Sequence, residues 1–266
     1  MDGWLVGRDA ERAALRAALA AALSAPRRAP SGGRLAAARA GQAPVVLVTG
    51  EAGAGKTTLA EDVLANIPAR VLRGQAAAWA GRPYEVVASA LRPALRGAVG
   101  PLPAILAQVL PELGAPPAEP SPAALAAAVC SVLATPVPVT SVLAAPVPSA
   151  DVPAVAAGDG LILFLDDLQW ADEASLDLLA ALAGAADGLP VALVGCYRSD
   201  ELPRGHRLRA VRALLRRQRR LAEIELGPLG DDDVKKMLAG LWGTVPQPEL
   251  AAMVASRADG LPFAIT

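Results

Sequence analysis

The feature that most constrains the fold is a glycine-rich loop directly after the apolar run PVVLVT. Residues 50–58 read GEAGAGKTT, and their spacing matches G-x-x-x-x-G-K-[ST] at Gly50, Gly55, Lys56 and Thr57. Glycine adopts backbone conformations that a Cβ forbids, so consecutive N–H groups of such a loop can turn inward toward an anion. We therefore predict a phosphate-binding loop rather than an ordinary flexible turn.

The residue types of this loop suit a nucleotide. The inward N–H groups and the start of the next helix favour phosphate, Lys56 can reach the β- and γ-phosphates, and the Thr57 hydroxyl can ligate Mg²⁺. The predicted nucleotide-binding residues of the loop are Gly50, Glu51, Ala52, Gly53, Ala54, Gly55, Lys56, Thr57 and Thr58.

The flanking sequence supports this interpretation over a chance glycine-rich loop. Val45, Val46, Leu47 and Val48 form a run typical of a buried parallel strand. After the loop, TTLAEDVLANI has helical spacing. Strand, loop and helix is the order that a phosphate cradle requires.

Strands alternate with helices along the rest of the chain, which predicts an α/β fold with a parallel five-stranded sheet flanked by helices, the fold of a P-loop NTPase. Further strands are expected at 69–74, 161–165, 190–198 and 221–226. Helices are expected from Asp9 onward and at 84–98, 102–110, 122–134, 174–184, 206–220, 231–242 and 248–258. We expect residues 1–227 to form the nucleotide-binding domain and 228–266 to be the start of a helical lid that is cut short. A linker-like loop at 24–43 and a Pro-rich, low-complexity loop at 135–158 interrupt the domain.

Two acids end the strand LILFL. Asp166 and Asp167 follow it directly, and ligands bind at the carboxyl ends of strands in open α/β sheets. We predict that Asp166 holds Mg²⁺ with Thr57, and that Asp167 orients or deprotonates the attacking water; a purely structural role is the alternative for Asp167. Arg198 ends the strand PVALVGCYR, from which it can reach a γ-phosphate. Lys56, Asp167 and Arg198 are thus the predicted catalytic residues.

Composition excludes several other classes. The net charge of −1 does not indicate a polyanion-binding protein. Cys130 and Cys196 show no metal or redox spacing and fit a reducing cytoplasm, and no secretion signal opens the chain. The uncharged stretch between Glu119 and Asp151 has the length of a membrane span, but its prolines would break a spanning helix. We therefore expect a cytoplasmic protein with no membrane contact.

These motifs together carry a family resemblance. VGRDAE at 6–11, the loop at 50–58, FLDDLQWADEASLDLLAAL at 164–182, CYR at 196–198 and GPLGDDDV at 227–234 occur in a familiar order. The chain resembles the AAA-like P-loop ATPase domain of the STAND class of signalling NTPases, as found in large LuxR-type (LAL) bacterial transcriptional regulators and cyclase-associated ATPases. The resemblance covers nearly the whole chain except the two loops.

The resemblance implies further site residues. In this family the segment matching Val6, Gly7 and Arg8 lines the adenine pocket, and a G-x-P near the lid approaches the nucleotide, which here implicates Pro262. This chain has Leu261 where the family usually has Asn. The alternative for the first segment is an ordinary helix start with Asp9 as its cap.

Other polar residues receive plainer interpretations. We expect Trp170 to be a packing residue and Asp172 to cap the following helix. The arginine-rich helix 206–220 has Leu208, Val211 and Leu215 as its expected buried stripe, and a solvated face is preferred to DNA contact.

The resulting hypothesis is an ATP-binding signalling switch with slow Mg²⁺-dependent hydrolysis, using ATP, ADP and Mg²⁺, and DNA contact is not expected in this segment itself. The alternatives are an oligomeric AAA-type ATPase, which would form ATP-dependent homo-oligomers, and a binding module that holds structural ADP. A small-molecule kinase is disfavoured because no acceptor-binding group of residues is evident.

Overall fold

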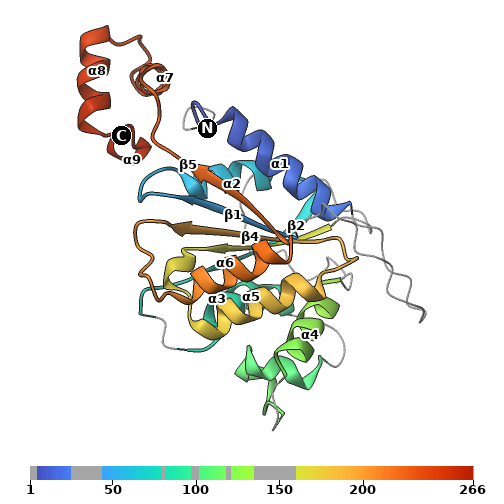
Figure 1. Cartoon of the computed structure of the whole chain (residues 1–266). Coiled ribbons are helices and arrows are strands. Elements are labelled where there is room, and N and C mark those ends of the chain that lie inside the picture. Colours follow the sequence, from blue (N-terminus) through green and yellow to red (C-terminus); the bar gives the residue numbers. More distant parts are fainter. Residues whose placement is uncertain are drawn as a thin grey trace.

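Five parallel strands form one sheet, in the order β2-β3-β4-β1-β5 (Figure 1). The computed structural model describes residues 5–24, 44–79, 82–96, 102–117, 121–134 and 160–265. The strands are β1 (Val45–Gly50), β2 (Ala69–Gln75), β3 (Gly160–Asp166), β4 (Val191–Arg198) and β5 (Leu221–Leu226). The predicted parallel five-stranded sheet is confirmed.

The strand order brings the predicted site residues to one edge of the sheet. β4 lies between β1 and β3, so the loops that follow β1, β3 and β4 emerge side by side. Gly50 pairs with Arg198 in register, and Asp166 pairs with Gln75. Residues that are far apart in sequence therefore meet at the carboxyl edge.

Helices cover both faces of the sheet, and β1 is therefore buried on both sides. Val46 and Val48 pack toward one helical layer, and Val45 and Leu47 pack toward the other. The first layer contains α1 (Asp9–Leu23) and α2 (Lys56–Ala65). The opposite layer contains α3 (Glu85–Leu95), α4 (Pro122–Ala134), α5 (Glu173–Ala185) and α6 (Arg207–Arg217) (Figure 1).

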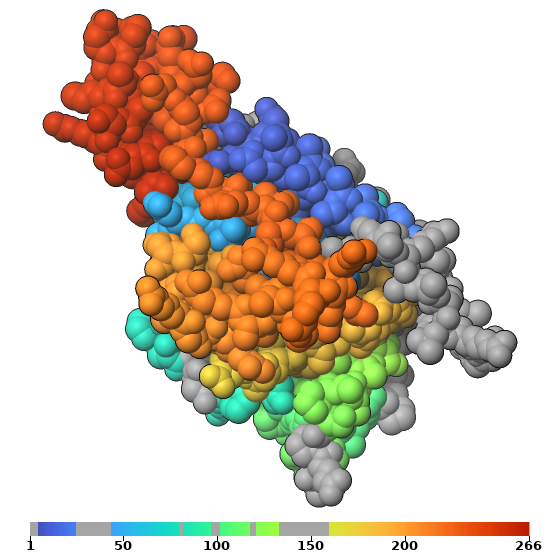
Figure 2. Space-filling model, in the orientation of Figure 1, coloured from blue at the N-terminus to red at the C-terminus, as the bar shows by residue number. Residues whose placement is uncertain are grey.

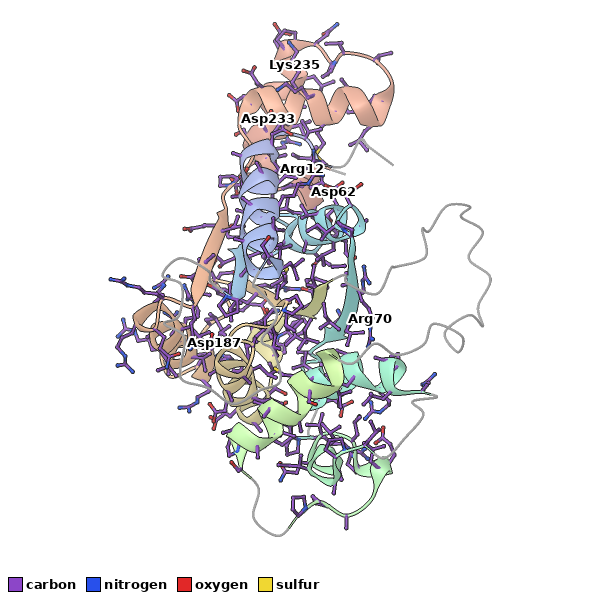
Figure 3. The ribbon with its side chains drawn as sticks, turned by 90° about the vertical axis from the view of Figure 1, so that its right-hand side faces the viewer. Arg12, Asp62, Arg70, Asp187, Asp233 and Lys235 are labelled. Carbon is purple, nitrogen blue, oxygen red and sulfur yellow. The ribbon has the colours of Figure 1, made fainter. Side chains whose placement is uncertain are left out.

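Polar contacts also join the two helices of the first layer. Arg12 of α1 and Asp62 of α2 form an ion pair with 3.0 Å between Nε and Oδ2 (Figure 3). On the other side, the expected stripe of Leu208, Val211 and Leu215 on α6 is buried, which confirms that prediction.

The last helices form a separate small lobe with its own core. α7 (Asp231–Trp242), α8 (Pro248–Arg257) and the short α9 (Pro262–Ile265) pack around Val234, Met237 and Leu238. This lobe projects beyond the sheet domain, beside the start of α1 (Figure 2). The two long helices were predicted, whereas α9 is too short to leave a periodic pattern.

The structure differs from the sequence prediction at 102–110. That stretch forms a short 3-10 helix, η1 (Ala104–Gln108), instead of an α-helix, and a second one, η2 (Pro111–Leu113), follows it. Pro111 has no N–H to donate and disfavours a helical conformation at Leu110, whose ψ is 82°. Residues 97–98 of the helix expected at 84–98 lie outside the described residues, as do 25–43 and 135–158 of the two expected loops.

Within the described residues, no helix has both the length and the apolar character needed to cross a membrane.

The close approach of α3 to β2 generates a stability prediction. A Cβ on Gly74 would lie 2.1 Å from the carbonyl oxygen of Val86, which is backbone and cannot move aside. We expect Gly74→Ala to lower the free energy of unfolding by about 1–3 kcal/mol. Urea unfolding followed by circular dichroism measures this. Gly205→Ala is the control, because a Cβ there meets nothing within 4 Å; equal effects of both changes would contradict the packing argument.

Candidate functional site

A cavity of about 470 Å³ opens at the carboxyl edge of the sheet, between the loop after β1 and the lid. It gathers most of the residues that the sequence singled out: Val6, Arg8, Gly53, Ala54, Gly55, Lys56, Thr57, Thr58, Asp166, Asp167, Arg198 and Pro262. Its lining also includes Leu5, Gln75, Met237 and Phe263. Gly7, Gly50, Glu51 and Ala52 are not among the lining residues.

The glycine loop has the backbone conformation that its sequence predicts. Gly53 and Gly55 have φ of 80° and 89°, in the left-handed region that side chains disfavour. Gly55 directly precedes α2, so the first N–H groups of that helix face the cavity. A helix start of this kind attracts an anion through its unpaired N–H groups and its dipole.

Lys56 rests on the carbonyl groups of its own loop. Its Nζ donates to the carbonyl oxygens of Gly50, at 3.0 Å, and Glu51, at 2.6 Å. Burial lowers the pKa of Lys56, and Arg198 acts in the same direction, while nearby acidic groups oppose them. The ammonium is thus desolvated and bound to neutral carbonyl oxygens, which a phosphate oxygen could replace as its hydrogen-bond partner.

Thr57 and Asp166 place two oxygen ligands together. The Thr57 hydroxyl donates to Asp166 Oδ2 at 2.8 Å, and the Asp167 N–H donates to Asp166 Oδ1 at 2.9 Å. Burial raises the pKa of Asp166, and the bond from Thr57 partly offsets this. A hydroxyl and a carboxylate are ligands that Mg²⁺ accepts alongside phosphate and water. The described residues contain no cluster of three or more His, Cys, Asp or Glu able to hold a metal without such help.

Asp167 is held by amide groups on both sides. Its Oδ2 accepts from Gln75 Nε2 at 3.2 Å, and its Oδ1 accepts from Gln169 Nε2 at 2.9 Å. The Arg198 Nε lies 3.8 Å from Oδ1. Asp167 itself has φ of 56°, a left-handed conformation that costs a non-glycine residue roughly 1–2 kcal/mol.

Arg198 is anchored at the mouth of the cavity. Its Nη1 donates to Glu201 Oε1 at 2.5 Å, and this bond raises the pKa of Arg198. The guanidinium lies 5.0 Å from the ring centre of Trp170, which is 37% exposed. Trp170, expected to be a packing residue, therefore packs against Arg198 rather than into the core.

The small C-terminal lobe touches the glycine loop directly. The Phe263 N–H donates to the Gly53 carbonyl oxygen at 3.2 Å, and a Cβ on Gly53 would lie 2.9 Å from Phe263 Cβ. Gly260, with φ of 66°, accepts from the Leu229 N–H at 2.8 Å. These bonds hold Pro262 and Phe263 over the loop.

The segment before α1 is hydrogen-bonded to Gly227, which follows the carboxyl end of β5. Arg8 is 5% exposed, and it donates to the Gly227 carbonyl oxygen at 2.5 Å and to Glu11 at 3.0 Å. A Cβ on Gly7 would lie 2.3 Å from the Asp233 carboxylate of α7. α1 starts at Asp9 without a side-chain cap, so the alternative of Asp9 as a cap is wrong.

The polar surroundings of the site are largely paired. Asp172 caps α5, which confirms that prediction: it accepts from the Ser175 N–H at 2.8 Å and also from the Tyr84 N–H at 3.0 Å. On the basic helix α6, Arg212 pairs with Glu223 at 2.7 Å, and Arg207 pairs with Asp177 at 2.7 Å.

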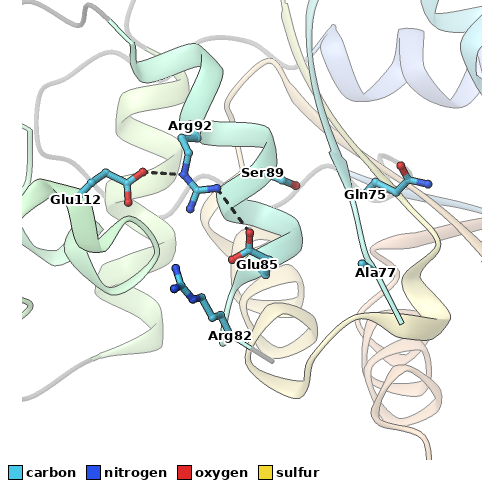
Figure 4. Close-up of a pocket in the computed structure, with 7 residues that line it drawn as sticks. All are labelled: Gln75, Ala77, Arg82, Glu85, Ser89, Arg92 and Glu112. Carbon is cyan, nitrogen blue, oxygen red and sulfur yellow. Dashed lines mark hydrogen bonds and ion pairs between the residues drawn. The ribbon is translucent and has the colours of Figure 1, made fainter. Parts of the chain in front are cut away.

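A second cavity, of about 660 Å³, is lined by residues of α3 and by Gln75 at the end of β2 (Figure 4). It is crossed by ion pairs from Arg92 to Glu112, at 2.8 Å, and to Glu85, at 3.6 Å. Gln75 lines both cavities. The lining has two arginines, Arg82 and Arg92, and two glutamates, Glu85 and Glu112, so their formal charges cancel.

Sequence reasoning missed Gln75, Gln169, Met237 and Phe263. Gln169 stands inside the DDLQWAD motif, so its position was available, but its role depends on contacts with the ends of two strands, β3 and β4. Gln75 ends a strand next to Asp166, which only the register shows.

Comparisons with known proteins give one family and several related folds. The model of a family described as "AAA ATPase domain" matches residues 33–194. Cdc6p from Pyrobaculum aerophilum has a TM-score of 0.53 at 14% identity, over 97% of this chain and 58% of that chain. The chain thus spans less than two thirds of that protein, and the likeness concerns the fold.

Two further structures have lower TM-scores. A variant of RuvB from Thermotoga maritima has a TM-score of 0.48 at 19% identity, over 98% of this chain and 59% of that chain. A STAND protein with a tetratricopeptide repeat sensor from Pyrococcus horikoshii has a TM-score of 0.42 at 14% identity, over 90% and 30%. No curated protein sequence matches the chain.

The double role of Asp172 generates a prediction. We expect Asp172→Ala to lower the free energy of unfolding by about 1–3 kcal/mol, because it removes the cap of α5 and leaves the Tyr84 N–H unpaired. Asp172→Asn keeps the accepting oxygen and should cost less. Thermal and urea unfolding of both variants check this; a harmless alanine variant would contradict the capping role.

Proposed function

Because the chain belongs to the AAA ATPase domain family, we propose that it binds ATP with Mg²⁺ in the cavity above the glycine loop and hydrolyses it slowly, as a signalling switch. The observation that carries the proposal is the convergence of Lys56, Thr57, Asp166, Asp167 and Arg198 on one cavity. Each comes from the carboxyl end of a strand or from the helix start beside it.

The binding step follows from charge and geometry. The N–H groups at the start of α2 surround the phosphates, and Lys56 exchanges two neutral carbonyl partners for phosphate oxygens. The Thr57 hydroxyl and the Asp166 carboxylate fit Mg²⁺, which would neutralise charge on the phosphates. In this role Thr57 would hold the ion through a hydroxyl lone pair while its O–H still donates to Asp166.

Hydrolysis would use Asp167 and Arg198. Asp167 would orient or deprotonate the attacking water, and Arg198 would contact the γ-phosphate. Asp167 is held by two amides and Arg198 by Glu201, so both must adjust before they act. This requirement supports slow turnover.

A switch also needs a moving element that reads the nucleotide. We propose that residues 228–266 act as this lid on a nucleotide-binding domain of residues 1–227, with Val6, Gly7, Arg8 and Pro262 around the adenine. The bond between Phe263 and Gly53 supports this, since any rearrangement of the loop alters it.

The finer assignment rests on the sequence motifs. VGRDAE and DDLQWAD favour the STAND class and, within it, the ATPase domain of a cytoplasmic LuxR-type transcriptional regulator. An oligomeric AAA-type ATPase is the second candidate, favoured by the family, and it would turn over steadily and assemble when ATP is present.

Two substitutions test the site. We expect Lys56→Ala to weaken Mg²⁺–ATP binding at least about tenfold, because it removes a charged phosphate donor. Asp167→Asn should bind ATP normally and release phosphate about 10²-fold more slowly. Isothermal titration calorimetry and a phosphate-release assay measure both. Arg217→Ala, on the exposed end of α6, is the matched control; unchanged binding in Lys56→Ala would contradict the proposal.

A third substitution tests the reading of the γ-phosphate. Arg198→Ala should reduce the preference for a non-hydrolysable ATP analogue over ADP by roughly tenfold or more, because only the former places a γ-phosphate near this strand end. Competition binding against a fluorescent nucleotide gives both affinities. Equal losses for the two nucleotides would assign Arg198 to general binding instead.

A further inference from the structure

Gln169 is a buried polar residue that joins the ends of two strands. It follows β3 in the short 3-10 helix η4 (Leu168–Trp170) and is 5% exposed. Its Nε2 donates to Asp167 Oδ1 at 2.9 Å, and its Oε1 accepts from the Arg198 N–H at 3.1 Å. One side chain thus contacts both residues that the proposed hydrolysis uses.

The partners of Gln169 fix which way its amide points. The Arg198 N–H can only donate, so the carbonyl oxygen of the amide must face β4. The NH₂ group then necessarily faces Asp167, whose carboxylate only accepts. No other uncharged side chain of this length has a donor and an acceptor in this arrangement.

The backbone of Gln169 is held as well. Its carbonyl oxygen lies 2.9 Å from His206 Nε2, and His206 Nδ1 accepts from the Leu208 N–H at 3.2 Å. The single histidine therefore links Gln169 to the start of α6, with its proton on Nε2. Gln169 is fixed at both its side chain and its main chain.

Asp167 needs such support because of its own conformation. Its φ of 56° is unfavourable for a residue with a Cβ, and such a conformation persists only where the surroundings impose it. The other amide contact, from Gln75, is longer at 3.2 Å and comes from an exposed side chain. Gln169 supplies the shorter and buried contact.

We propose that Gln169 is a positioning residue that sets the Asp167 carboxylate for the attacking water and couples it to the strand end that carries Arg198. This inference rests on the proposed hydrolysis at the same site. A shift of the Arg198 backbone on meeting a γ-phosphate would pass through one amide to Asp167, so the acid is aligned when ATP is present.

The test compares Gln169→Glu and Gln169→Leu with wild type. Glu has the same shape and still accepts from the Arg198 N–H, but it places a second carboxylate against Asp167. We expect turnover of Mg²⁺–ATP to fall on the order of 10- to 100-fold in both variants, with the KM for ATP changed less than about threefold. In Gln169→Glu the acid limb of the pH–rate profile should move to higher pH, because adjacent carboxylates share a proton. Gln218→Glu, on the exposed end of α6, is the charge control.

A double variant separates positioning from folding. In Asp167→Asn with Gln169→Glu, the amide and carboxylate exchange places, so the hydrogen bond is restored with its polarity reversed. We expect this variant to recover the unfolding midpoint lost by Gln169→Glu while turnover stays low.

The outcomes distinguish the inference from the proposed function. Wild type that releases no phosphate overturns both. Wild type that turns over, beside Gln169→Glu and Gln169→Leu variants with unchanged kcat and pH profile, overturns the positioning role alone. Loss of kcat that the double variant regains would overturn both, because turnover would then not need the Asp167 carboxylate.

Discussion

The site depends on the pairing of β4 between β1 and β3. This order brings together the ends of β1, β3 and β4, at Gly50, Asp166 and Arg198, and the register sets Gly50 beside Arg198. Because the strands are parallel, all three loops emerge at the same edge, where the start of α2 adds its N–H groups. The buried apolar residues of β1, β3 and β4 fix the positions of these strand ends, and the polar groups that follow the strands are therefore kept in contact.

The polar side chains at this edge form hydrogen bonds with neighbouring groups of the protein. Lys56 is held by carbonyl groups of its loop, Thr57 by Asp166, and Arg198 by Glu201. A ligand must therefore offer better partners than these, and a Mg²⁺-bound triphosphate does so at several points together. Binding then requires coordinated exchange of hydrogen bonds at the loop and at the end of β4. Such an exchange is a physical basis for a switch, since it also alters the lid contact at Gly53.

Local patterns were sufficient for much of this architecture. The β-branched runs and glycine loop predicted the sheet and the phosphate cradle, since strand and loop chemistry depend on neighbouring residues in sequence. The same logic located Asp166, Asp167, Arg198 and the cap at Asp172. It could not find Gln75 or Gln169 as partners of Asp167, because those contacts depend on strand order and register. It also expected one helix at 102–110, where the structure has the 3-10 helix η1 and Pro111 starts the next one.

The central claim is that nucleotide phosphate occupies the cavity above the glycine loop and is read by the lid. Hydrogen–deuterium exchange with and without Mg²⁺ and a non-hydrolysable ATP analogue tests it most directly. The account predicts slower exchange in two separate segments, the loop at 50–58 and the lid segment at 260–265, because the loop N–H groups bind phosphate and the Phe263 N–H bonds to the loop. Unchanged exchange in the loop at saturating nucleotide would contradict the account.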